Sequence, residues 1–317
     1  MQRYIARRLL LMIPTLLGVT FIVFVMVRSV PGDVVDLLLG EYGAGDRESK
    51  EALLKEYKLD GNIVGQYIRW LGDVVRLDLG SSIISGRAVT DELQHRLPIT
   101  LQLSFMAIFF SLLIAIPVGI VSAIRQDTAI DYFGRSFAIS LLAVPGFWVA
   151  IMLITLAGRY FTWGVPPKSY IPFTDDPLGN IKMLWVPSMI LGAGLSGGVM
   201  RFTRSAMLEV LRQDYVRTAW SKGLRERVII TRHVMRNALI PVVTVVGLQL
   251  PILVGGTVII ETVYSIPGMG RYYVDSVNAK DYPIIQSINL VVALVVVFAN
   301  LGVDLIYSVL DPRIRYT

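Results

Sequence analysis

Six apolar runs, each near the length that crosses a lipid bilayer, dominate this sequence. They cover residues 9–27, 101–123, 136–157, 184–200, 238–260 and 284–310, and the fourth is the shortest. A transmembrane helix needs about 20 mainly apolar residues, because the hydrocarbon core is roughly 30 Å thick. Within that core a helix satisfies its own backbone hydrogen bonds. The runs therefore predict an all-α membrane protein with six transmembrane helices.

The composition of the chain supports this class. Hydrophobic residues make up 54% and charged residues 17%, whereas about 25% of residues are charged in soluble domains. The net charge of +6 is not taken as a sign of nucleic-acid binding, because the basic residues gather in loops beside the apolar runs. The sequence has no cysteine, which excludes disulfides, thiol catalysis and cysteine metal sites.

Loop charges predict the orientation of the chain. Residues 201–237 contain nine Lys/Arg and three Asp/Glu, and three arginines lie within residues 1–8. Counted from Arg28, the segment that ends at residue 100 contains nine basic and twelve acidic residues. Because strongly basic loops stay in the cytoplasm, we expect both termini and the loop 201–237 on that side, and residues 29–100 outside.

This orientation divides the chain into three parts. Residues 1–28 hold the N-terminus and first transmembrane helix, residues 29–100 form an extracytoplasmic segment, and residues 101–317 form a five-helix transmembrane core that includes the cytoplasmic loop 201–237. The first run resembles a signal peptide in its basic start, but its length and the absence of an A-x-A-like cleavage site favour an uncleaved anchor.

The outer segment has apolar residues at helical spacing, among them Ile63, Tyr67 and Ile68. It is therefore predicted to form short helices. They either cap the transmembrane helices or provide a docking surface for an external protein, and a cap is the favoured interpretation for most of these residues.

Proline and glycine interrupt several runs, and proline kinks a helix because it removes one backbone hydrogen bond. The interruptions are Pro14, Pro117, Pro145 with Gly146, and Pro251 with Gly255 and Gly256. Ordinary kinked packing is the favoured interpretation. The alternative is a translocation pathway that opens at such a kink, for which the fifth run offers Gln249, Leu250, Leu253 and Gly256.

Single residues suggest two other classes. Asp304 lies inside the last apolar run, where a buried acid suggests a functional site such as that of an ion-coupled transporter. Such a transporter needs a coupling-ion site at the membrane midplane. Pairing of Asp304 with a neighbouring helix is the favoured interpretation. Gly194–Gly197 matches the G-x-S-G pattern of intramembrane serine proteases. The only histidines, His95 and His233, lie outside the runs, so close packing of small residues is favoured.

No phosphate-loop motif is present, so any ATP must be bound by another chain.

The basic loop contains a predicted short helix. Asp214 is a suitable N-cap, Gly223 suits the left-handed position after the helix, and Val216, Ala219 and Trp220 form an apolar stripe. So short a helix is unstable alone. The residues leave open whether it docks on a partner protein or lies on the membrane surface.

Resemblance to a known family favours docking of this helix on a partner protein. The pattern R-T-A-x-x-K-G at residues 217–223, followed by RHVMRNALIPVVTVVGLQL, resembles the permease subunits of ABC importers in the dipeptide/oligopeptide branch, which also includes nickel and glutathione systems. RYIARRLLLMIPTLLGVTFIVF at the start, ETVYSIPGMGRYYVDSVNAKDYPIIQ after the fifth run and DPRIR at residues 311–315 extend the resemblance over nearly the whole chain. The chain is identified as a member of that family.

The resemblance implies a coupling helix that sits in a groove of an ATPase subunit. It would contain Asp214, Tyr215, Val216, Arg217, Thr218, Ala219, Trp220, Lys222 and Gly223. The family's general EAA pattern has Glu and Ala at the positions that Arg217 and Thr218 occupy here. At the position of Trp220 it has a polar or basic residue. We expect the apolar stripe to face the ATPase.

The resemblance also implies the assembly and its task. This chain would be a non-catalytic subunit of the cytoplasmic (inner) membrane, paired with a second permease, two cytoplasmic ABC ATPases and an extracytoplasmic substrate-binding protein. It would bind no cofactor itself, because ATP and Mg²⁺ belong to the ATPases. Peptides are the expected substrates, with glutathione, nickel or another small solute as alternatives.

Overall fold

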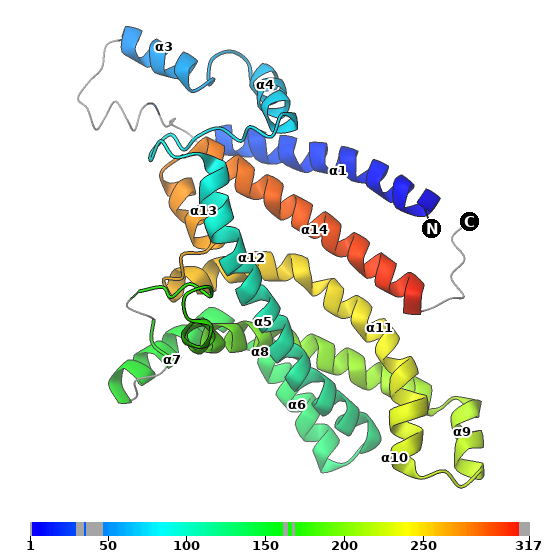
Figure 1. Cartoon of the computed structure of the whole chain (residues 1–317). Coiled ribbons are helices and arrows are strands. Elements are labelled where there is room, and N and C mark those ends of the chain that lie inside the picture. Colours follow the sequence, from blue (N-terminus) through cyan, green and yellow to red (C-terminus); the bar gives the residue numbers. More distant parts are fainter. Residues whose placement is uncertain (1, 30–34, 36–46, 161–163, 167–168, 311–317) are drawn as a thin grey trace. The chain divides into compact units, whose positions relative to one another are not determined.

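A computed structural model describes residues 2–29, 35, 47–160, 164–166 and 169–310 (Figure 1). Outside its helices, the described chain has one isolated antiparallel bridge, between Ser81 and Ala88. The all-α prediction is therefore confirmed. The helices are α1 (Gln2–Arg28), α3 (Arg47–Glu56), α4 (Ile63–Val75), α5 (Val89–Ile124), α6 (Ala129–Ala143), α7 (Gly146–Tyr160), α8 (Pro177–Leu211), α9 (Asp214–Ser221), α10 (Glu226–Val228), the π-helical turn η1 (Ile229–Val234), α11 (Met235–Gly247), α12 (Gln249–Val263), α13 (Met269–Asn278) and α14 (Tyr282–Leu310).

Five of the described helices are long and apolar enough to cross a membrane, and a sixth span results if one bent pair is counted. The five are Leu10–Arg28, Val89–Ile124, Pro177–Leu211, Glu226–Gly247 and Tyr282–Val303. The bent pair is α6 with α7. The predicted number of spans thus agrees with the fold when the bent pair is one span.

The third apolar run, 136–157, is not one straight helix. It breaks between α6 and α7, whose axes meet at 89°. Val144 has extended backbone angles, φ −88° and ψ 121°, because the ring of Pro145 disfavours helical angles in the residue before it. The kink predicted at Pro145 is therefore a complete break between two helices.

The fifth run, 238–260, is also divided. α11 ends at Gly247, and α12 begins at Gln249. Pro251 falls in the first turn of α12. The N–H groups of a first turn have no partner within the helix, so proline costs no helical hydrogen bond there. The apolar helix that precedes this break extends back to Glu226, well before the start of the predicted run.

The chain forms two compact units: Met1–Ile99 with Gly268–Val297, and Thr100–Pro267 with Phe298–Thr317. In the first unit, α4 begins at an N-cap, Asn62, whose side chain accepts a hydrogen bond from the Gly65 amide. The Tyr67 hydroxyl then joins α4 to α1 through Thr20 and the Leu17 carbonyl, at 2.9 and 3.0 Å. The short helices predicted within 29–100 are present among its described residues.

The second unit is built around α8, which packs against α6 and α11. Two glycines of α8 bring helix backbones together. A Cβ atom on Gly197 would lie 2.5 Å from the Ala138 carbonyl oxygen, and one on Gly192 would lie 2.5 Å from that of Ala107. This is the small-residue packing that membrane helices use. The side chain of Asp304, the acid of the last apolar run, lies outside the described residues.

Candidate functional site

The predicted short helix of the basic loop is α9, directly after α8 (Figure 1). Val216 is 0% exposed and Ala219 is 7% exposed. Both pack in a core with Met207 of α8 and with Ile229 and Val234 of η1. Burial of its own apolar face thus supplies the stability that eight residues lack alone.

This burial corrects the expected orientation of the apolar stripe. Val216 and Ala219 face the helices of their own chain, and only Trp220 of the three is exposed, at 48%. Val216 and Ala219 lie three residues apart and therefore share one face of the helix, which packs inward. The outward surface of the helix carries Trp220 together with Tyr215, Arg217, Thr218 and Lys222.

The two ends of α9 differ in how well they are capped. The N-cap is Gln213, with no side-chain cap bond, and Asp214 is the first helical residue. The predicted N-cap at Asp214 is therefore wrong by one position. Gln213 already has the extended angles of a cap, φ −73° and ψ 147°. The Asp214 carboxylate instead lies 3.6 Å from Arg217, with both side chains exposed.

The C-terminal end is closed by a Schellman motif. Gly223 has φ +73°, which confirms its predicted left-handed position. The Gly223 amide donates to the Trp220 carbonyl at 2.9 Å, and the Leu224 amide donates to the Ala219 carbonyl at 3.4 Å. These bonds fix where the helix stops and where the chain turns toward α10.

A polar contact that the sequence patterns did not reveal also holds α9. The Asn237 side-chain amide of α11 donates to the Tyr215 hydroxyl at 2.8 Å. It acts together with the apolar core beneath α9. The partners lie 22 positions apart in the sequence, beyond any helical spacing rule.

A buried charged cluster near the same unit's α5–α6 turn was likewise missed. Asp131 is fully buried and accepts two hydrogen bonds from Arg204 of α8, both 2.7 Å long. The Ser122 hydroxyl and the Asp127 amide also donate to it. The acid sits in the first turn of α6, just before the third apolar run, so the pattern of apolar residues gave no signal for it.

The four pathway candidates have different surroundings. Gln249 is 8% exposed and its side-chain amide donates to the Leu195 carbonyl at 3.1 Å, while Leu253 is 1% exposed. Leu250 and Gly256 are half-buried. The first two contribute to packing within the chain, and the last two retain some accessible surface.

The protease pattern shows the packing that was favoured for it. Ser196 is fully buried, and its hydroxyl donates to the Ala193 carbonyl of its own helix at 2.7 Å. Among the described residues, no group of three or more His, Asp or Glu could hold a metal ion.

A known protein family covers the part of the chain that holds this site. The family described as "Binding-protein-dependent transport system inner membrane component" matches residues 115–316, which include α9, its buried contacts and the α8–α11 core. The chain belongs to this family.

Relatives within the family match over the whole chain. The oligopeptide transport system permease protein AppB of Bacillus subtilis is 38% identical over 100% of both chains. The dipeptide transport system permease protein DppB of Escherichia coli K12 is 37% identical over 100% of this chain and 99% of its own length. The family resemblance seen in the sequence is thereby confirmed.

Solved structures support the fold. A chain of the MetNI methionine ABC transporter in an inward-facing conformation has a TM-score of 0.58 and 15% identity, covering 69% of this chain and 96% of the solved chain. At that identity the likeness concerns the fold alone. This family member therefore has an ABC-permease fold and is an inner-membrane component of a transport system.

Proposed function

We propose that this chain is the membrane-spanning permease of an ATP-driven importer for short peptides. The observation that carries the proposal is full-length similarity, at 37 and 38% identity, to a dipeptide and an oligopeptide permease. The chain has no phosphate-loop motif, so the ATP and Mg²⁺ are assigned to separate ATPase subunits. The chain itself is a non-catalytic subunit.

The proposed topology places both termini and the loop 201–237 in the cytoplasm and the segment 29–100 outside. Its support is the loop charge, nine basic against three acidic residues in 201–237. The domain division into 1–28, 29–100 and 101–317 follows from that orientation. An extracytoplasmic binding protein would meet the segment 29–100, where Ile68, Val75 and Leu77 are exposed.

The proposed coupling element is α9, acting on two cytoplasmic ATPases that serve this chain and a second permease. Its outward face offers Trp220 as an apolar anchor, beside the positive charges of Arg217 and Lys222. Its inward face is fixed by Val216 and Ala219. A short helix held on one side and exposed on the other transmits movement as a rigid body.

Substrate chemistry is the finer part of the proposal. Glutathione, nickel and other small solutes are alternatives within the importer class, and an ion-coupled carrier is a distant one. The test is reconstitution of this chain with its second permease, ATPases and binding protein in liposomes. We expect uptake of labelled di- to pentapeptides that requires ATP, and no ATP hydrolysis by the chain alone. Uptake of nickel or glutathione without peptide uptake would contradict the peptide assignment, and hydrolysis by the chain alone would contradict its subunit role.

A further inference from the structure

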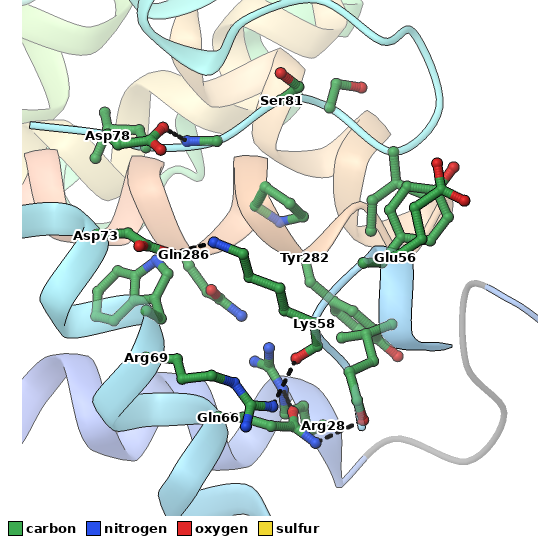
Figure 2. A pocket seen from close by; sticks show the side chains of 18 of the residues that line it. Arg28, Glu56, Lys58, Gln66, Arg69, Asp73, Asp78, Ser81, Tyr282 and Gln286 are labelled. Carbon is green, nitrogen blue, oxygen red and sulfur yellow. Dashed lines mark hydrogen bonds and ion pairs between the residues drawn. The ribbon is translucent and has the colours of Figure 1, made fainter. Parts of the chain in front are cut away.

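The first compact unit contains a pocket of about 440 Å³ (Figure 2). That volume lies within the range of roughly 300–1,000 Å³ that small-molecule sites occupy. Its lining comes from the end of α1, from α4 and its flanking loops, and from the start of α14.

In the lining, Arg28 has no acidic partner among the residues that the structure describes. Arg28 donates from Nε to the neutral side chain of Gln66 at 2.7 Å, and its guanidinium lies 3.5 Å from the centre of the Phe24 ring. The other basic residues of the lining have carboxylate partners: Lys58 pairs with Asp73 at 2.7 Å, and Arg69 pairs with Asp60 at 3.2 Å. Among the described residues, no carboxylate pairs with Arg28.

Three hydrogen-bond donors of this lining are buried without a partner among the described residues. They are Nη1 of Arg28, the indole N–H of Trp70 and the side-chain N–H₂ of Gln286. Gln286 is only 4% exposed. Leaving a buried donor unpaired costs about 1–3 kcal/mol, so three around one cavity indicate a ligand that accepts hydrogen bonds. Guanidinium and indole groups only donate, and carboxylates and phosphates are the acceptors that arginine binds through two parallel bonds.

The opposite side of the pocket has the opposite character. Figure 2 shows Arg28 and Gln66 on one side, and Asp78 and Ser81 on the other. Glu56 adds a second carboxylate to the lining. A ligand with a carboxylate at one end and an ammonium group at the other is therefore matched by the charges. A dianion such as phosphate would meet repulsion from the acidic side.

We propose that this pocket binds a short zwitterionic peptide, with its C-terminal carboxylate on Arg28, Trp70 and Gln286 and its ammonium group toward Asp78. The inference rests on the proposed function in its choice of peptides as ligands. The proposed peptide site lies in the first unit of the chain. It is therefore separate from the four pathway candidates of α12, which lie in the second unit.

The test uses the full chain in lipid nanodiscs, without partners, and isothermal titration with the dipeptide Ala-Ala. We expect binding that weakens about 10-fold or more for the C-terminal amide of Ala-Ala, which loses the charged acceptor. N-acetyl-Ala-Ala, which lacks the ammonium group, should bind severalfold more weakly. Inorganic phosphate should not compete. Absence of Ala-Ala binding, or equal binding of the amide, would overturn the site.

Variants locate the binding. Arg28→Gln removes the forked donor, and Gln286→Leu removes the buried amide with little change in size. Each should weaken Ala-Ala binding about 10-fold, whereas Arg76→Gln, an exposed arginine outside the lining, should not. Because the comparison of Ala-Ala with its amide uses the unaltered chain, a variant that fails to fold leaves the test intact. Wild-type binding by both lining variants would contradict the assignment.

The two proposals fail separately. If the reconstituted importer takes up peptides while the isolated chain binds no Ala-Ala, the function stands and the pocket assignment falls. If the chain binds Ala-Ala through Arg28 but the complete importer moves no peptide, the pocket stands and the peptide-import function falls.

Discussion

The side-chain amide of Asn237 donates a hydrogen bond to the hydroxyl of Tyr215 over 2.8 Å. It joins the outward surface of α9 to α11, one of the helices packed on α8. The contact therefore links the proposed ATPase-facing helix with the transmembrane core by a polar bond, in addition to the apolar contacts of Val216 and Ala219.

Removal of this hydrogen bond should loosen coupling without unfolding the chain. Tyr215→Phe keeps the ring and deletes the hydroxyl, and a net hydrogen bond contributes about 0.5–1.5 kcal/mol. We expect normal membrane abundance and fewer peptides transported per ATP hydrolysed. Tyr160→Phe, at another exposed tyrosine, is the matched control. A double-mutant cycle with Asn237→Ala should be non-additive, and full additivity would contradict a functional link between the two side chains.

The Asp131–Arg204 pair should matter for stability rather than for coupling. Asp131→Asn leaves Arg204 without its buried counter-charge, and breaking one partner of a buried pair costs about 3–5 kcal/mol. We expect a lower unfolding temperature of the purified chain and less protein in the membrane. Asp214→Asn, where the carboxylate is 97% exposed, should leave the unfolding temperature unchanged. Equal thermal stability of the two variants would show that the cluster is not structural.

Apolar length predicted much of this fold, because membrane spans follow from burial in lipid, whereas the orientation inferred from loop charge stays a prediction. The all-α class, the short outer helices and the left-handed Gly223 all agree with the structure. What the patterns could not give were features decided by contacts between distant residues. The direction in which Val216 and Ala219 face depends on Met207, Ile229 and Val234, and no local periodicity says whether a stripe packs on its own chain or on a partner.

The breaks in the third and fifth runs show a related limit. Pro145 and Pro251 were recognised as interruptions, yet a proline can either kink a helix or end it. The proline alone does not tell which outcome occurs: the chain turns by 89° after Ala143 and restarts as a helix at Gln249. The outer pocket was missed for the same reason, since Arg28, Trp70 and Gln286 are brought together only by the fold.

Cysteine labelling should test the proposed topology directly, because the chain has no cysteine of its own. Ser221→Cys lies at the end of α9, and Ser49→Cys lies in α3. In intact cells an impermeant maleimide should label Ser49→Cys, whereas Ser221→Cys should react only after the membrane is opened. Labelling of Ser221→Cys from outside would reverse the orientation.

The pathway proposal can be tested at the same four positions of α12. Leu250 and Gly256 keep accessible surface, while Gln249 and Leu253 are buried. We expect Leu250→Cys and Gly256→Cys to change their reactivity between nucleotide-free and ATP-trapped importers. Gln249→Cys and Leu253→Cys should stay unreactive in both states unless the packing of α12 on α8 opens. Constant reactivity at Leu250 and Gly256 would place the pathway elsewhere.

The cap of α9 provides the sharpest test of coupling. Gly223 has φ +73°, and apart from the adjacent residues no heavy atom lies within 4 Å of the place that a Cβ atom would take. Gly223→Val therefore acts through backbone strain of about 1–2 kcal/mol alone. The strain shifts the end of the helix and with it Trp220, while the transmembrane core is untouched. Gly72→Val, at a helical glycine of α4 with equally open space, is the control without a positive φ.

For Gly223→Val we expect normal membrane abundance, reduced co-purification of the ATPases and loss of peptide uptake. Trp220→Ala should weaken the same association by removing an exposed apolar anchor. Val216→Ala, by contrast, removes two methyl groups at a fully buried position and should lower the free energy of unfolding by about 2 kcal/mol. If Gly223→Val and Trp220→Ala both keep full ATPase association and wild-type uptake, α9 is not the coupling element, and the exposed residues of the basic loop outside α9 become the next surface to test.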